Sequence, residues 1–155
     1  MSYKNNPVLL ILIFTFTLMF LSQAKAGGPI GADLDIEFVP DTIGPGSNSR
    51  LVYTFTAIEG GIVTDIAVTN TLPAGVTLSS PSNPFSDCNG AVVSAPNGGG
   101  TISISDISLA PDTSCKVEVN VTSSMIGTFM DSTGNVTSSS GTGNFQAVTG
   151  LSVAI

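Results

Sequence analysis

Apolar side chains recur at every second position along most of this sequence, and that spacing restricts the folds it can adopt. The clearest example spans residues 115–121, where apolar residues alternate with Lys116, Glu118 and Asn120. A period of two places alternate side chains on opposite faces of a β-strand, so one face can be buried. No segment has a sustained apolar repeat of 3.6 residues, the spacing of an amphipathic helix. The sequence therefore predicts an all-β fold.

Turn-forming residues separate these alternating segments at regular intervals. Turn-forming residues cluster at 97–100, as Asn-Gly-Gly-Gly, and at 138–141, as Ser-Ser-Ser-Gly. Glycine and asparagine tolerate the positive φ values of tight turns. The first of these clusters predicts a β-hairpin joining residues 91–95 to residues 101–105. The expected strands, each with one inward face, lie at 33–38, 51–55, 62–69, 76–78, 91–95, 101–105, 115–121, 127–137 and 145–153. Seven to nine short strands predict an Ig-like antiparallel β-sandwich.

The first twenty-six residues have the organisation of an export signal. Lys4 supplies positive charge, residues 8–21 form an apolar run, and Ala24, Lys25 and Ala26 give the small-x-small pattern of a cleavage site. We expect cleavage between Ala26 and Gly27, which leaves residues 27–155 as a single secreted or cell-surface domain. The alternative is an uncleaved anchor, but the apolar run is shorter than the roughly 18 residues that such a span needs.

The charge of the mature chain argues against nucleic acid as a partner. Four Lys and Arg against eleven Asp and Glu give a net charge of −7, and loss of Lys4 and Lys25 changes the balance to 2 − 11 = −9. Phosphate backbones are bound by clustered Lys and Arg, and Arg50 and Lys116 are isolated. Anionic lipid surfaces are disfavoured for the same reason. We also expect no transmembrane segment after cleavage.

Cys88 and Cys115 are the two cysteines of the chain. In an oxidising compartment an even pair predicts a disulfide, which stabilises a fold by about 3 kcal/mol for a loop of this length. A metal site is disfavoured because the sequence has neither CxxC spacing nor histidine.

Two longer motifs resemble a known family. Residues 35–51 read DIEFVPDTIGPGSNSRL, residues 64–76 read TDIAVTNTLPAGV, and the spaced Cys88 and Cys115 follow. Together they are similar to the Ig-like conserved-repeat domains, still of unknown function, of bacterial exported and surface proteins. The resemblance spans residues 32–153 in a single copy. It implies an Ig-like sandwich and an extracellular setting, and it names no substrate.

Several residues are candidates for a metal site or a covalent crosslink. Asp33, Asp35 and Glu37 share one strand face and could bind calcium together with Asp65 or Asp131, although a solvated face is the simpler interpretation. Lys116, which a Lys to Asn or Asp isopeptide bond would need, points away from the predicted core. The aromatic residues Phe38, Tyr53, Phe55, Phe129 and Phe145 are expected in the core.

The sequence predicts a protein without catalytic activity. A serine or threonine nucleophile needs a base, and the chain has no histidine, so we expect no enzyme, no catalytic residue and no cofactor. The prediction is a non-catalytic structural or adhesive module, secreted or on the cell surface, that binds an envelope, matrix or protein partner. The alternatives are a filament subunit that self-associates by pairing a terminal strand, and a secreted protein that binds calcium or a small ligand.

Overall fold

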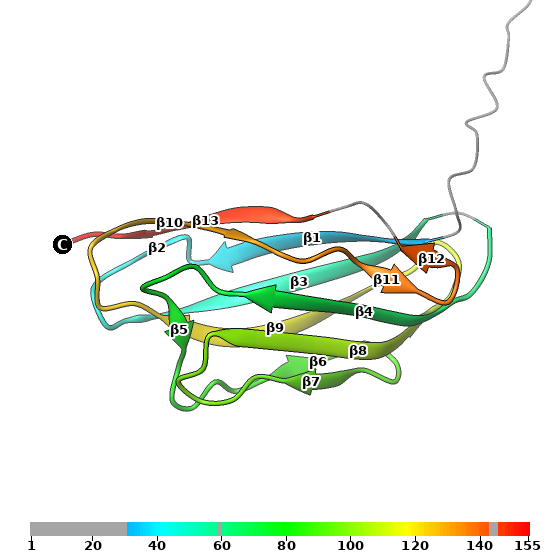
Figure 1. Ribbon diagram of the computed structural model, residues 1–155, viewed down its shortest axis with the longest axis horizontal. Coiled ribbons are helices and arrows are strands. Elements are labelled where there is room, and N and C mark those ends of the chain that lie inside the picture. Colours follow the sequence, from blue (N-terminus) through cyan, green and yellow to red (C-terminus); the bar gives the residue numbers. More distant parts are fainter. Residues whose placement is uncertain (1–30, 59, 143–145) are drawn as a thin grey trace, which may run out of the picture.

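The computed structural model describes residues 31–58, 60–142 and 146–155. Figure 1 shows an elongated all-β molecule whose long strands follow its long axis. The strands are β1 (Gly31–Val39), β2 (Thr42–Ile43), β3 (Asn48–Ile58), β4 (Val63–Thr71), β5 (Thr77–Leu78), β6 (Phe85–Ser86), β7 (Val92–Ser94), β8 (Thr101–Leu109), β9 (Ser114–Thr122), β10 (Gly127–Ser132), β11 (Thr137–Ser138), β12 (Gly141–Thr142) and β13 (Val148–Val153). The predicted β-sandwich is confirmed, and its seven strands of six residues or more are β1, β3, β4, β8, β9, β10 and β13.

The first layer has the order β1-β3-β9, with β5 and β6 both pairing with the far edge of β9. Its register puts inward-facing side chains from three strands in continuous rows. One row joins Ile36, Tyr53 and Val117, and the rows on either side repeat the pattern. These three side chains are buried, as the alternation predicted. A fully buried apolar side chain of this size contributes about 1.5–3 kcal/mol, so such rows dominate the stability of the layer.

The second layer consists of β12-β11-β4-β8-β7 and of β10-β13-β2. A single bridge between Asn70 and Thr133 connects the two groups of strands. The predicted hairpin is confirmed, because β7 and β8 pair antiparallel around residues 97–100. One pairing differs from the antiparallel expectation, since the short β2 lies parallel to β13.

The strand expected over residues 127–137 is divided in the structure. Its first part, β10, pairs with β13, whereas its last part, β11, pairs with β4. The chain crosses between these partners at Gly134, whose amide donates to the carbonyl of Thr69 at 2.9 Å. A Cβ at Gly134 would stand 2.9 Å from that carbonyl oxygen, so only glycine permits the approach. The buried positions change parity at this crossing, from Asp131 and Thr133 to Val136, which a single alternating strand over residues 127–137 does not predict.

The core between the two layers is apolar apart from one polar cluster. Phe38, Tyr53 and Phe55 lie in it as predicted, and Phe129 packs against it while partly exposed. The last strand begins at Val148 rather than at the predicted residue 145, and Phe145 lies outside the described residues. The predicted signal peptide and its Ala26–Gly27 cleavage site also lie outside them.

The two ends of the folded region lie apart. The start of β1 and the carboxyl end of the chain are at opposite ends of the long axis (Figure 1). Within the part of the chain that the structure describes, no helix has the length and apolarity to cross a membrane.

Candidate functional site

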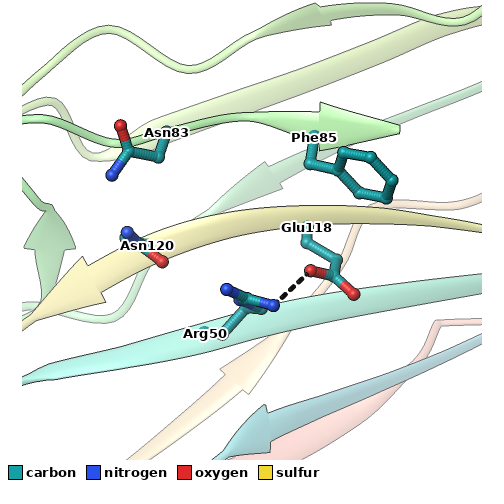
Figure 2. A pocket seen from close by; sticks show the side chains of 5 residues that line it. All are labelled: Arg50, Asn83, Phe85, Glu118 and Asn120. Carbon is teal, nitrogen blue, oxygen red and sulfur yellow. Dashed lines mark hydrogen bonds and ion pairs between the residues drawn. The ribbon is translucent and has the colours of Figure 1, made fainter. Parts of the chain in front are cut away.

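A hollow of about 410 Å³ lies on the outer face of the first layer. We call it the outer-face hollow, and it is lined by Arg50, Asn83, Phe85, Glu118 and Asn120. Figure 2 shows Asn83 and Phe85 above the strand that carries Glu118 and Asn120, with Arg50 on the next strand. Its volume falls within the roughly 300–1,000 Å³ of small-ligand sites.

Strand register brings these side chains together. Arg50 on β3 is directly opposite Asn120 on β9, and Glu118 on β9 is directly opposite Phe85 on β6. Directly opposed residues in antiparallel strands have Cβ atoms about 4.5–5.5 Å apart and share a face. Because the neighbouring positions face the core, the floor of the hollow rests on the buried Leu51, Val117 and Val119.

An ion pair crosses the floor of the hollow. Arg50 Nη1 donates to Glu118 Oε2 at 2.8 Å (Figure 2). The Arg50 side chain remains 55% exposed and that of Glu118 20%, so the pair is open to solvent on the arginine side. Exposed pairs of this kind add only about 0–1 kcal/mol to stability.

Phe85 is the apolar element of the hollow, and sequence reasoning missed it. Its side chain is 57% exposed, although large aromatic residues are usually mostly buried. The residues before it form a loop rich in serine, proline and asparagine, without the alternation that identified the other strands. Only the pairing of β6 with β9 places Phe85 beside Glu118. A lone aromatic residue in a polar loop was the one signal available in the sequence.

The disulfide between Cys88 and Cys115 anchors the segment that carries Phe85. The structure bonds the two sulfur atoms across a sequence separation of 27 residues. Cys115 faces the core from β9, and Cys88 follows β6 by two residues. Asp87 strengthens the attachment, because its Oδ1 accepts a hydrogen bond from the amide of Lys116. The rim of the hollow is thereby fixed to the first layer.

A second polar group, buried between the layers, contrasts with the hollow. We call Tyr53, Asn70, Asp131 and Thr133 the interior polar cluster. Asn70 Nδ2 donates to the Tyr53 hydroxyl at 2.9 Å and to Asp131 Oδ2 at 2.7 Å. Each of these side chains is at most 2% exposed. The cluster links β3, β4 and β10, which belong to both layers.

The interior polar cluster has unusual protonation energetics. Burial raises the pKa of the Asp131 carboxyl, although its hydrogen bond from Asn70 acts in the opposite direction. Burial also raises the pKa of Tyr53, which keeps its hydroxyl neutral. Within the described part of the chain, Asp131 Oδ1 and Asn70 Oδ1 have no hydrogen-bond partner. The raised pKa of Asp131 follows, since ionisation would put a charge on a carboxyl that water does not reach.

The residues considered for calcium are not brought together. Asp33, Asp35 and Glu37 lie exposed on the outer face of β1, whereas Asp131 is inside the core. Asp65 lies on β4 of the other layer. Among the described residues, the one group of three potential metal ligands is Asp87, Cys88 and Cys115. Its two sulfur atoms are bonded to each other, so they cannot act as thiolate ligands.

Lys116 lies exposed on the outward face of β9, as the sequence predicted. The buried Asn70 and Asp131 face the core instead, so this lysine cannot reach them for an isopeptide bond. Asp131, whose carboxyl has a raised pKa, is sealed between the layers. The arrangement suits noncovalent recognition at the outer-face hollow better than proton transfer to a substrate.

Comparison with known proteins identifies the family. The model of a domain of unknown function (DUF7933) matches residues 33–153. The chain belongs to this family. The match agrees with the domain-of-unknown-function resemblance that the motifs at residues 35–51 and 64–76 indicated. No curated protein sequence matches the chain.

Three solved structures illustrate the similarity of fold. A cohesin module from a family 33 glycoside hydrolase of Clostridium perfringens matches with TM-score 0.56 and 11% identity, over 80% of this chain and 97% of the other. BslA, a bacterial hydrophobin, matches with TM-score 0.52 and 22% identity, over 82% and 97%. The collagen-binding domain of a Staphylococcus aureus adhesin matches with TM-score 0.52 and 10% identity, over 81% and 99%. At these identities the DUF7933 domain shares a fold with them.

Proposed function

We propose that this DUF7933 domain is an exported, non-catalytic adhesive module that holds its partner in the outer-face hollow. The observation that carries the proposal is the 57% exposed Phe85 beside the Arg50–Glu118 ion pair. Aromatic and arginine side chains dominate the energy of most recognition surfaces. Here both are attached to paired strands, so little conformational freedom is lost on binding.

Export is supported by the organisation of residues 1–26 and by the disulfide. A disulfide persists in oxidising compartments and is rare in the cytosol. The similar folds of a cohesin module and an adhesin domain support a binding role. The acidic balance of the chain keeps an exported protein soluble without attracting it to nucleic acid.

Retention on washed cell envelopes of the producing organism tests the proposal. Fluorescently labelled mature protein is compared with Phe85→Ala, and with Met130→Ala as a matched control. Met130 is 62% exposed on β10 of the second layer, away from the hollow. We expect Phe85→Ala to weaken retention at least about fivefold, equivalent to roughly 1 kcal/mol, and Met130→Ala to have no effect. Equal retention of all three proteins would contradict the proposal.

A second candidate, a filament subunit, is favoured by the position of β1. This nine-residue strand ends the first layer, and among the described residues its strand pairing is with β3 alone. An open edge can accept a strand from a neighbouring molecule. Direct pairing of β1 with its own copy would bring Asp33, Asp35 and Glu37 against like charges, so a different donor strand is required. Electron microscopy of concentrated protein tests this, and uniformly monomeric particles would exclude it.

A further inference from the structure

The charge balance of the outer-face hollow restricts its ligand. Arg50 is one of the two cationic side chains of the described residues, and Glu118 neutralises it at 2.8 Å. The other lining residues, Asn83, Phe85 and Asn120, carry no charge. An anionic ligand would have to displace Glu118 from Arg50, the cation that lines the hollow, and a cationic ligand would have to displace Arg50 from Glu118. The hollow therefore favours a neutral ligand over a charged one.

The hydrogen-bonding groups of the hollow restrict the ligand further. Each asparagine amide offers two N–H donors and a carbonyl acceptor, the guanidinium offers donors, and the carboxylate offers acceptors. Asn83 is exposed and Asn120 half-buried, so both amides can reach a bound molecule. Such a lining suits a molecule whose polar groups both donate and accept hydrogen bonds. Sugar hydroxyls do both, and a sugar carries several of them around one ring.

Phe85 supplies the apolar surface that a sugar ring needs to pack against. A pyranose ring has a face made of C–H bonds, and this face packs against an exposed aromatic ring. The 57% exposed Phe85 lies directly opposite Glu118, so an apolar platform stands beside hydrogen-bonding groups at the spacing of paired strands. A bound peptide strand would instead need open backbone groups, which lie at a sheet edge and not on this face.

We infer that the outer-face hollow binds a neutral oligosaccharide, with one sugar ring stacked on Phe85 and its hydroxyls bonded to Asn83, Asn120 and the Arg50–Glu118 pair. This inference rests on the proposed function and names its ligand class. Since Arg50 and Phe85 remain more than half exposed, the hollow holds each sugar unit weakly, with a dissociation constant on the order of 1 mM. Useful attachment then depends on many copies binding one polysaccharide.

Titration followed by NMR tests the ligand class. The probes are tetrasaccharides of glucose, mannose and N-acetylglucosamine as neutral sugars, and oligogalacturonate and oligoglucosamine as charged ones. We expect at least one neutral sugar to shift the resonances of Asn83, Phe85 and Asn120, and the charged sugars to bind at least about tenfold more weakly. Phe85→Ala should abolish the shifts, whereas Phe85→Tyr, which keeps the ring, should retain them. Shifts produced only by the charged sugars, or by none, would overturn the inference.

Competition on envelopes separates this inference from the proposed function. Retention that depends on Phe85 and is displaced by the neutral sugar supports both. Retention that depends on Phe85 but resists every neutral sugar overturns the ligand class and leaves the adhesive role, with a protein partner as the alternative. Retention independent of Phe85 overturns both.

Discussion

The outer-face hollow and the interior polar cluster use similar side chains to opposite effect. In each, a carboxylate on one strand bonds a nitrogen donor on another, at 2.8 Å for Glu118 and 2.7 Å for Asp131. Water solvates the first pair and is excluded from the second. A solvated pair adds little to folding and leaves its groups available to a ligand, whereas breaking a buried pair leaves a buried polar group without its partner, which is costly. Burial thus separates the residues that bind from those that hold the layers together.

The largest expected difference comes from removing an asparagine amide at each place. Asn70→Ala leaves Asp131 and Tyr53 without their bonds and opens a cavity, so we expect a loss of about 3 kcal/mol in unfolding free energy. Asn120→Ala makes the same chemical change in the hollow and should cost less than about 0.5 kcal/mol. Urea denaturation measures both. Similar losses of unfolding free energy in the two variants would contradict the proposed difference between the interior polar cluster and the outer-face hollow.

The disulfide should affect both regions, though unequally. Replacing Cys88 with Ala and Cys115 with Val removes a cross-link that closes a loop of 27 residues, at a cost of about 2–4 kcal/mol. Because Cys88 follows β6, the variant should also loosen the rim that carries Phe85 and weaken ligand binding. Thermal unfolding and the neutral-sugar titration measure the two effects. Intact mass after alkylation of exported protein checks the bond itself, and two freely labelled thiols would contradict it.

Acid should stabilise the interior polar cluster. The folded-state pKa of Asp131 is raised above its unfolded value, so the folded protein binds this proton more tightly. Its contribution is fully present below the unfolded pKa of about 4 and is lost as pH rises through the folded pKa, by at most about 1.4 kcal/mol per pH unit.

The difference in unfolding free energy between wild type and Asp131→Asn isolates this contribution from the other carboxyls. It should fall with rising pH and then level off. A wild-type minus Asp131→Asn difference that rises with pH would contradict the account.

The smallest expected effect on stability is that of the surface ion pair. Arg50→Ala should change the unfolding free energy by less than about 1 kcal/mol, because the exposed pair is screened by solvent. The same variant removes donors from the hollow and should weaken sugar binding severalfold. Calorimetric unfolding and NMR titration of one sample compare the two. A large loss of stability with unchanged binding would invert the proposed roles.

The sequence predicted the three long strands of the first layer, β1, β3 and β9, because apolar residues alternate along each of them. Leu34, Tyr53 and Val119 sit where a period of two requires inward side chains, and packing reinforced that pattern. The period of two also places Asp131 on the same strand face as Phe129 and Thr133, which is the buried face. A carboxyl group is expected at the surface, and the hydrogen bond from Asn70 on β4 lowers the cost of burying this one.

The hollow could not be predicted, because it depends on pairing between distant segments. Asn120 and Glu118 were expected to face outward, and they do. Nothing local placed Phe85 or Arg50 beside them, since these residues lie 33 and 68 positions from Glu118 and meet it only through the β6–β9 and β3–β9 registers. Register between distant strands follows from the whole packed layer rather than from a local pattern.

One NMR titration tests the central claim most directly, because the side-chain amides of Asn83, Asn120 and Asn70 report on both regions in a single spectrum. Addition of the neutral tetrasaccharides should shift the amide signals of Asn83 and Asn120 and leave that of the buried Asn70 in place. Unmoved signals from Asn83 and Asn120 with every neutral sugar that binds, or shifts centred on Asn70, would contradict the account.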